Sequence, residues 1–464
     1  MNNCTLLVLG ATGDLAKRKL IPAIYKLLED KKLSNFVLVG AASSDVTPAK
    51  MLDAAREFID NFDQKLWQQL MDHTYYQSLD FNEPSGYAKL KQLVELSEKK
   101  HGLSGNRLVY LATPADFFCT ITHSLGNAKI IVKDAPDAKV WHRVVYEKPF
   151  GKSMQSAQEI NACIAKYLNE RQVFRIDHYL TKELVSNIAL VRFTNIIFEP
   201  LWNAKYVDSV QIRLCESLGL EGRGRYYDSY GVLKDVVQNH ILQLLALIAM
   251  ESPFELTGEY IRDKKEEVLQ KVRCDTGVLG QYAGYKTENE VAPNSKTATF
   301  ALLRMFVDTN RWKGVPFYIE SGKRLQEKIT IITIKFKDIV CPLIAGKECP
   351  SNCLVIRVEP EASFALDLNV KPRGRAPGVV PVKMKFSHIE EFGSKTPEAY
   401  EILLESIFNG DQAISVRFDE IEQSWRIIEC VEALNLPVYE YEQGSTGPKE
   451  ALAFLKQNNV RWLQ

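Results

Sequence analysis

The sequence has no excess of charge of either sign. Lys and Arg together number 58, as do Asp and Glu, so the formal net charge at pH 7 is zero. A balanced chain has no general attraction for nucleic acid or for an anionic membrane surface. We therefore expect neither as a partner, and any anion site must be a local cluster of basic groups.

Long hydrophobic runs and closely paired cysteines are also scarce. The most apolar stretch, 241–250, is too short to span a bilayer and contains Gln243. Of nine scattered cysteines only Cys349 and Cys353 are close, and no second Cys or His pair at zinc spacing follows them. Reduced thiols and no metal site are expected. The chain starts without the basic and apolar segments of a signal peptide, which predicts a cytoplasmic location.

What is present is the composition of a globular protein with two or three domains: 464 residues, 46% hydrophobic and 25% charged. Residues 4–9 predict a buried strand, 10–13 a turn, 14–30 a helix and 36–39 a second strand. Pro22 predicts that this helix is kinked or becomes regular only near that residue. Strands at 108–111 and 141–146 continue the alternation, so we predict a doubly wound parallel sheet of the Rossmann type over residues 1–177.

The pattern changes after about residue 180. Strand-like runs lie at 209–215, 329–336 and 354–358, several of them separated by loops, and helices are expected at 233–250 and 397–408. The Gly- and Pro-rich stretch 371–381 predicts a loop. Residues 178–464 are therefore predicted to form a second, α+β domain with a large, mainly antiparallel sheet.

The first turn has the spacing of a dinucleotide site. Gly10, Gly13 and Ala16 follow a strand and open a helix, so backbone N–H groups could approach a pyrophosphate, with Thr12 adding a hydroxyl. An acid ending the second strand would favour NAD, and a nearby Arg would favour NADP. Residues 40–45 read GAASSD, with neither at the strand end, so this choice stays open.

Two further clusters carry polar groups that suit chemistry. In RIDHYLTKE (175–183), donors at His178, Tyr179 and Lys182 could surround a phosphate. The same residues fit equally well the start of a solvated helix capped by Asp177. His240 lies in an apolar helix. It is either a core histidine or, near Asp235, the general base that oxidising an alcohol requires. Lys148, between a strand end and a proline, is a third candidate.

Together these motifs resemble one enzyme family. GATGDLAKRKL (10–20), EKPFG (147–151), RIDHYLTKE, the run 221–243 ending in KDVVQNHILQ, GVPFYIESGKRL (314–325), AYEILLESIFNGDQ (399–412), SWRII (424–428) and GSTGP (444–448) are similar to glucose-6-phosphate dehydrogenases. The matches run in order along nearly the whole chain. The resemblance implies oxidation of glucose 6-phosphate at C1 to 6-phosphogluconolactone, the first step of the oxidative pentose phosphate pathway, with hydride transfer to NADP or NAD.

The resemblance also implies roles for residues. His240 would be the general base and Asp177 the carboxylate that orients it, while Lys148 and Lys19 would bridge towards substrate and cofactor. The remaining substrate contacts would be His178, Tyr179, Lys182, Glu216, Asp235, Lys323 and Lys328, and the cofactor contacts Gly10, Ala11, Thr12, Gly13, Asp14, Leu15, Ser43 and Lys148. A homodimer or homotetramer that pairs through the large sheet is implied.

Three departures from the family pattern bear on these expectations. Thr181 replaces a Gly, which is costly if the position needs positive φ. Ser43 stands where many members have an Arg for the 2′-phosphate of NADP, so NAD or dual use is open. Glu320 stands where some members have an Arg for a second, structural NADP, so we expect none here. The alternatives are another two-domain NAD(P)-dependent sugar dehydrogenase and a non-catalytic cofactor-binding relative.

Overall fold

The computed structural model describes residues 3–135, 137–338, 349–373, 379–393 and 398–463. It divides into two compact units that are not two continuous stretches of sequence. The first unit contains 1–181, 257–262 and 397–422, and the second contains 182–256, 263–396 and 423–464. The domain limits predicted from the sequence, 1–177 and 178–464, remain a prediction.

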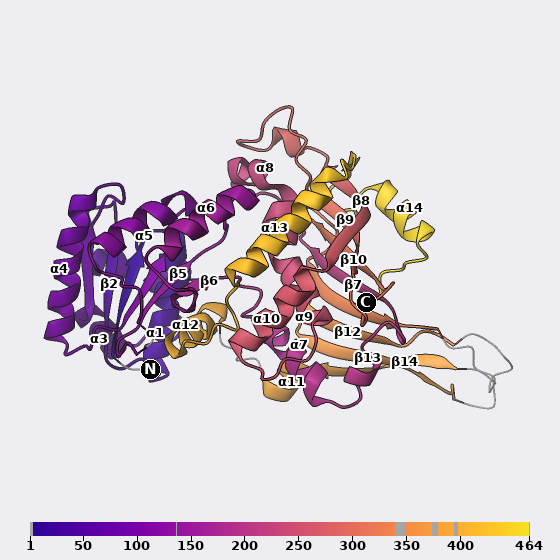
Figure 1. Cartoon of the computed structure of the whole chain (residues 1–464), viewed down its shortest axis with the longest axis horizontal. Helices are drawn as coiled ribbons and strands as arrows, with labels where there is room; N and C mark the ends of the chain where they lie inside the picture. The colour runs from indigo at the N-terminus through magenta and orange to yellow at the C-terminus, as the bar shows by residue number, and fades with distance from the viewer. Residues whose placement is uncertain (1–2, 136, 339–348, 374–378, 394–397, 464) are drawn as a thin grey trace. The chain divides into compact units, whose positions relative to one another are not determined.

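The first unit is built on a parallel sheet of six strands in the order β3-β2-β1-β4-β5-β6 (Figure 1). Its strands are β1 (Cys4–Leu9), β2 (Phe36–Ala42), β3 (Thr74–Ser78), β4 (Arg107–Leu111), β5 (His142–Tyr146) and β6 (Val173–Arg175). The central strands β1, β2 and β4 are buried at every residue, as expected when helices cover both faces. The predicted Rossmann-type sheet is confirmed.

Helices surround this sheet. They are α1 (Ile21–Glu29), α2 (Pro48–Asp53), α3 (Gln64–Asp72), α4 (Pro84–Lys100), α5 (Phe118–Asn127), α6 (Met154–Ala165) and α12 (Ala399–Asn409). A π-helix, Ala16–Leu20, precedes α1, so the regular helix starts just before Pro22, as that residue predicted.

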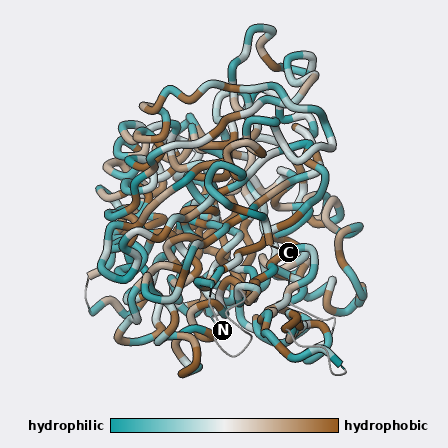
Figure 2. The backbone as a smooth tube through the Cα atoms, turned by 90° about the vertical axis from the view of Figure 1, so that its right-hand side faces the viewer, coloured by the Kyte–Doolittle hydropathy of each residue, from teal (hydrophilic) through white to brown (hydrophobic). Residues whose placement is uncertain are grey.

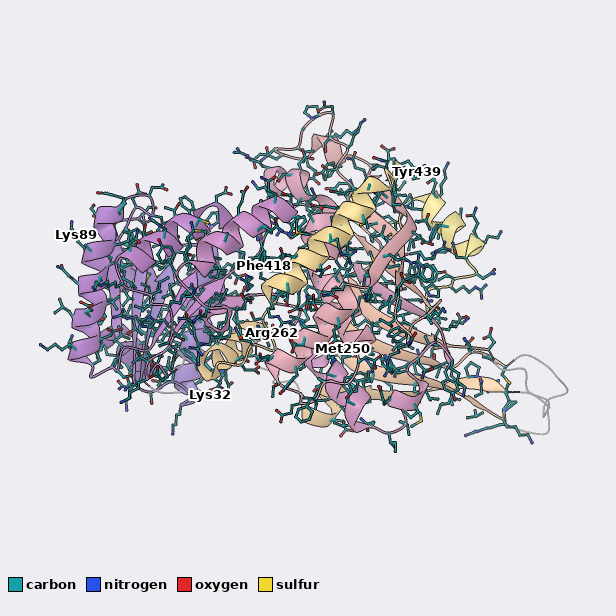
Figure 3. The ribbon with its side chains drawn as sticks, viewed as in Figure 1. Lys32, Lys89, Met250, Arg262, Phe418 and Tyr439 are labelled. Atoms are coloured by element: carbon teal, nitrogen blue, oxygen red, sulfur yellow. The ribbon has the colours of Figure 1, made fainter. Side chains whose placement is uncertain are left out.

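Helix α12 comes from far along the sequence, yet it completes the core of the first unit. Its Leu403, Leu404 and Ile407 are buried in one cluster with Ile24 and Leu28 of α1. At its surface, Lys32 donates to Glu405 at 2.7 Å, and Figure 3 labels Lys32 near the end of α1.

The second unit is built on a nine-stranded mixed sheet in the order β14-β13-β12-β11-β7-β10-β9-β8-β15. The strands are β7 (Val207–Cys215), β8 (Val272–Tyr282), β9 (Phe300–Val307), β10 (Pro316–Gly322), β11 (Ile329–Phe336), β12 (Cys353–Glu359), β13 (Ser363–Val370), β14 (Val380–Ser387) and β15 (Val438–Tyr441). Only the pairs β7–β10 and β8–β15 are parallel among the described strands of this sheet, so the prediction of a mainly antiparallel sheet is confirmed.

The helices of this unit are α7 (Glu183–Thr194), α8 (Gly224–Val232), a π-helix (Leu233–Ile241), α9 (Leu242–Ala249), α11 (His388–Phe392) and α14 (Lys449–Gln457). Two more, α10 (Gly258–Leu269) and α13 (Phe418–Ala433), begin in residues of the first unit and continue in residues of the second. The predicted helix 233–250 is therefore a π-helix followed by an α-helix.

The π-helix and α9 form a buried core helix. By length and composition the continuous stretch Gly224–Ala249 could cross a membrane, but 89% of its most apolar window is buried inside the protein. Arg192 and the indole of Trp202 donate to the carbonyl of Ile248, which closes the end of this helix. Along the described residues, hydrophobic stretches alternate with hydrophilic ones (Figure 2).

One local prediction needs correction. The loop expected at 371–381 ends earlier, because Val380 and Pro381 already belong to β14, where they pair with Val370 and Asn369 of β13. Residues 374–378 of that predicted loop lie outside the described residues. Pro381 is tolerated because β14 is an edge strand, where one missing N–H donor costs little.

Candidate active site

The dinucleotide turn lies where the strand order of the first unit reverses, between β1 and β4. Gly10 has φ +86°, and a Cβ placed on it would lie 2.3 Å from the carbonyl oxygen of Ala112, just after β4. Gly13 closes the turn by donating to the Gly10 carbonyl at 2.9 Å. Ligands of doubly wound sheets bind beyond the strand ends at this switch point. Only glycine fits at residue 10, so the turn is built for close approach of backbone to a ligand.

The neighbouring cofactor candidates fit this turn. Ala11 is buried, Thr12 and Leu15 are half-buried, and Asp14 is exposed with Lys17 at 3.6 Å. Thr12 Oγ1 lies 3.3 Å from the hydroxyl of Ser44, at the end of β2. Ser43 is exposed directly after β2, so the turn and the end of β2 form one polar edge. This arrangement fits a dinucleotide whose pyrophosphate sits at the helix N-terminus.

Lys148 follows β5 and is half-buried, joined to Pro149 by a cis peptide. The preceding residue, Glu147, accepts hydrogen bonds from the hydroxyls of Tyr110 on β4 and Tyr400 on α12, the latter at 3.3 Å. Burial raises the pKa of Glu147; these hydrogen bonds and the Lys148 ammonium oppose the rise, and the Asp177 carboxylate adds to it. Two sequence-distant segments, β4 and α12, thus hold the side chain of the residue that precedes Lys148.

Asp177 comes two residues after β6, and its position depends on a distant segment, 411–418. Arg175 donates its N–H to the Ser415 hydroxyl at 3.0 Å and accepts from Val416 N, also at 3.0 Å. Ile176 and Ser415 form an antiparallel bridge. β6 is the last strand of its sheet, and these contacts pair the outer side that would otherwise lack a partner. Asp177 is buried, and its Oδ1 accepts from the backbone N–H of Tyr179 at 2.9 Å.

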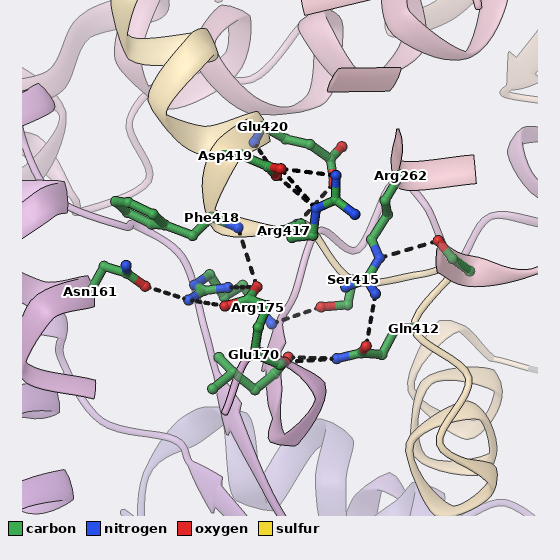
Figure 4. A network of polar contacts seen from close by, with 12 residues as sticks. Asn161, Glu170, Arg175, Arg262, Gln412, Ser415, Arg417, Phe418, Asp419 and Glu420 are labelled. Carbon is green, nitrogen blue, oxygen red and sulfur yellow. Dashed lines mark hydrogen bonds and ion pairs between the residues drawn. The ribbon is translucent and has the colours of Figure 1, made fainter. Parts of the chain in front are cut away.

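Side chains reinforce that pairing (Figure 4). The Arg175 guanidinium, 2% exposed, donates to Glu170 Oε1 at 2.5 Å and to Asn161 Oδ1 at 2.8 Å. The backbone N–H of Phe418 donates to the same Glu170 oxygen at 3.2 Å. Glu170 thus binds both the Arg175 side chain and the backbone of Phe418, which limits the movement of the strand end that leads to Asp177.

The turn after Asp177 carries the predicted phosphate donors. The rings of His178 and Tyr179 lie 5.0 Å apart, and Thr181 Oγ1 donates to the His178 carbonyl at 2.8 Å. Thr181 is not among the residues with positive φ, so this position does not require glycine. Its hydroxyl stabilises the turn instead. Lys182 then immediately precedes α7.

His240 and Asp235 share the π-helix of the second unit. Both are buried, and their spacing of five residues matches the i→i+5 hydrogen-bond repeat of a π-helix. Tyr226 donates to Asp235 Oδ1 at 3.2 Å, and Asn239 Oδ1 accepts from the backbone N–H of His240 at 2.7 Å. A π-helical turn is frequently found at functional sites, which favours a functional histidine over a packing residue.

Further substrate candidates of the second unit form ion pairs. The buried Lys323 donates to Glu216 Oε2 at 2.5 Å, and its ammonium lies 5.1 Å from the centre of the Tyr227 ring. In the first unit Lys19 donates to Glu398 at 3.0 Å. Glu320 is buried and accepts from Arg213 at 2.5 Å, so its carboxylate is already paired with a cation.

Sequence reasoning missed two acidic residues that contact the candidates. Glu147 binds the two tyrosines beside Lys148, and Glu359 accepts a hydrogen bond from Lys182 and lies 3.6 Å from Lys328. The only sequence signal for Glu147 was its place before Lys148 in EKPFG. Glu359 directly follows the predicted strand 354–358 and precedes Pro360, a position that suits a site but carries no specific motif.

Comparisons with known proteins match both halves of the chain to one enzyme family. The family model for the NAD binding domain of glucose-6-phosphate dehydrogenase matches residues 7–187, and that for the C-terminal domain matches 189–463. The glucose-6-phosphate 1-dehydrogenases of Chlamydia muridarum and Bacillus subtilis are each 38% identical, over 99% and 98% of this chain and 96% and 97% of theirs.

Solved structures lead to the same family. A glucose-6-phosphate dehydrogenase in complex with its substrate glucose-6-phosphate has 31% identity and a TM-score of 0.92, covering 100% of this chain and 99% of its own. The Mycobacterium avium enzyme has 33% identity and a TM-score of 0.86 over the same shares. The resemblance inferred from the motifs is confirmed. The chain belongs to the glucose-6-phosphate dehydrogenase family.

Proposed function

We propose that this protein oxidises D-glucose 6-phosphate at C1 to 6-phospho-D-glucono-1,5-lactone, with NADP or NAD as hydride acceptor. One observation carries the proposal: the two motifs most specific to the family, RIDHYLTKE and KDVVQNH, are both built into well-defined local structure. In the first, Asp177 follows strand β6, which pairs with β5 on one side and contacts Ser415 on the other. In the second, His240 is buried in a π-helix.

In this proposal His240 accepts the proton of the C1 hydroxyl. An imidazole titrates near neutral pH and so can act as a general base at the working pH. Asp177 would hold the imidazole in the correct tautomer and stabilise the imidazolium that forms. The bound nicotinamide would supply the acceptor for the C1 hydride, and the Gly10 turn would hold its pyrophosphate.

The remaining residues bind and orient. His178, Tyr179, Lys182 and Lys328 would contact the phosphate, which is remote from C1, so its binding energy can position the reacting carbon. Glu216 and Asp235 would accept hydrogen bonds from sugar hydroxyls, with Lys323 beside them. Lys148 and Lys19 would bridge towards substrate and cofactor.

The direct test is a spectrophotometric assay at 340 nm with glucose 6-phosphate and each cofactor in turn. Reduction of at least one cofactor is expected, and unphosphorylated glucose should react far more weakly. No reduction of either cofactor by a folded preparation would contradict the proposed function.

Lys182→Ala is expected to raise KM for glucose 6-phosphate by about tenfold or more, because it removes a charge-assisted contact to the phosphate. The measurement is steady-state kinetics with varied sugar phosphate. Lys89→Ala is the matched control, since Lys89 is exposed on α4 (Figure 3) and carries no proposed role. An unchanged KM in Lys182→Ala would remove this residue from the phosphate site.

Ser43→Arg is expected to shift the ratio of kcat/KM for NADP over NAD upwards by about tenfold. A guanidinium at the end of β2 could pair with the 2′-phosphate, and a hydrogen bond to a charged group contributes roughly 1.5 kcal/mol. Ser43→Gln, of similar length but uncharged, should change the ratio much less. Identical ratios in the wild type and both variants would show that residue 43 is not at the 2′ position.

The assembly we propose is a homodimer or homotetramer in the cytoplasm, with no second, structural NADP. Edge strand β14 supports a role of the large sheet in pairing, since apolar side chains at alternate positions, Val380, Val382, Met384 and Phe386, are all exposed. Such a row normally becomes covered by another surface. Sedimentation would give the oligomeric state.

A further inference from the structure

Glu359, the last residue of β12, brings together two lysines proposed for the phosphate site. Its Oε1 accepts a hydrogen bond from the Lys182 ammonium, and the Lys328 ammonium lies 3.6 Å from the same oxygen. The Thr330 hydroxyl donates to Oε2 at 3.4 Å. One carboxylate therefore contacts both cations that a phosphate dianion would need.

The surroundings keep this carboxylate charged. Burial by itself would raise the pKa of Glu359, but the hydrogen bond and charge of Lys182, followed by the charge of Lys328, hold that pKa below its usual value. The side chains of Lys182 and Glu359 are 21% and 22% exposed, so solvent screens this pair only in part. At neutral pH the phosphate site thus already contains its own anion.

We infer that Glu359 sets the affinity and selectivity of the phosphate site, because its carboxylate competes with the substrate phosphate for Lys182 and Lys328. The inference rests on the proposed function, which assigns those lysines to the phosphate. An arriving phosphate must displace or share the ammonium groups and meets repulsion from the carboxylate. A sugar phosphate gains further contacts through its sugar, whereas free inorganic phosphate does not. Glu359 therefore disfavours simple anions more than the substrate.

The test replaces the carboxylate by its uncharged isostere. Glu359→Gln is expected to lower KM for glucose 6-phosphate about fivefold, the size expected for a partly exposed ion pair. The inhibition constant of inorganic phosphate, measured as a competitive inhibitor, should fall at least as much, and kcat should change less than KM. Glu361→Gln is the matched control, because Glu361 lies two residues on and contacts Lys385 and Ser387 instead.

Each other outcome overturns the inference. Unchanged constants for both substrate and inorganic phosphate would mean that the carboxylate does not compete, and a raised KM would mean that it orders the lysines for the phosphate. If Glu359→Gln melts at a much lower temperature, Glu359→Asp gives a second test: the retracted charge should lower the inhibition constant of phosphate below that of the wild type, and an unchanged constant would contradict the inference. A wild type inactive with glucose 6-phosphate would instead refute the proposed function.

Discussion

His240→Asn is expected to lower kcat by about 100-fold or more while changing KM for glucose 6-phosphate only modestly. The reason is that a general base acts in the transition state, so its loss affects the chemical step and not ground-state binding. Asparagine keeps a polar side chain but cannot take a proton near neutral pH. Because His240 is buried, the variant must first be shown to fold, by thermal unfolding and by binding of NADP or NAD.

The pH profile makes this prediction specific. In the wild type the acid limb of kcat/KM should report the pKa of the base, and in His240→Asn that limb should disappear. A packing residue would not change the shape of the profile. Near-normal turnover, or a low rate with the original acid limb, would exclude His240 as the base.

Arg175→Ala is expected to lower the free energy of unfolding of the first unit by about 3 kcal/mol. Breaking a buried ion pair by removing one partner costs roughly 3–5 kcal/mol, and the lower end applies because the Glu170 side chain is 37% exposed and partly screened by solvent. The variant also loses the contact of the guanidinium with Asn161 and with the ring of Phe418, whose centre lies 5.6 Å away.

Amide hydrogen exchange can measure this loss of stability at the segments that Arg175 holds together. Amides of β6 and of 411–418 should exchange faster in Arg175→Ala, because the side chain no longer supports their pairing. The matched control is Arg171→Ala, four residues earlier, whose side chain is 51% exposed and pairs with Asp134 at 3.8 Å. That exposed pair should contribute less than about 1 kcal/mol. Equal effects of the two substitutions would contradict the role given to Arg175.

The sequence predicted the features that depend on local pattern. The Gly10 turn and the strands around it follow from the period of hydrophobic residues and from glycine spacing, both of which act within a few residues. Pro22 correctly marked where α1 becomes regular. The family motifs added the candidate base, its carboxylate and the phosphate donors, because such motifs fix residue types at short spacing.

Local pattern was less informative for the second sheet. Of its strands only β7, β11 and β12 were predicted. Val380 and Pro381 were assigned to a loop because residues 371–381 are rich in Gly and Pro, and β14 becomes evident only through its pairing with β13. The π-helix at Leu233–Ile241 was predicted only as an ordinary helix. Its extra residue per turn places Asp235 and His240 at matching positions, which a 3.6-residue repeat would not do.

By itself, then, the sequence determined the fold class of the two units, the dinucleotide turn and, through the family motifs, the candidate base, since these depend on residue patterns that act within short stretches of the chain. Only the tertiary structure decided that Ser415 pairs with the strand leading to Asp177, that Tyr400 binds Glu147, and that Glu359 contacts Lys182 and Lys328. Three of these pairs are far apart in sequence: 240 residues separate Arg175 from Ser415, 253 separate Glu147 from Tyr400, and 177 separate Lys182 from Glu359. Contacts at such range form through packing and ion pairing after the chain has folded back on itself, and no local pattern encodes them.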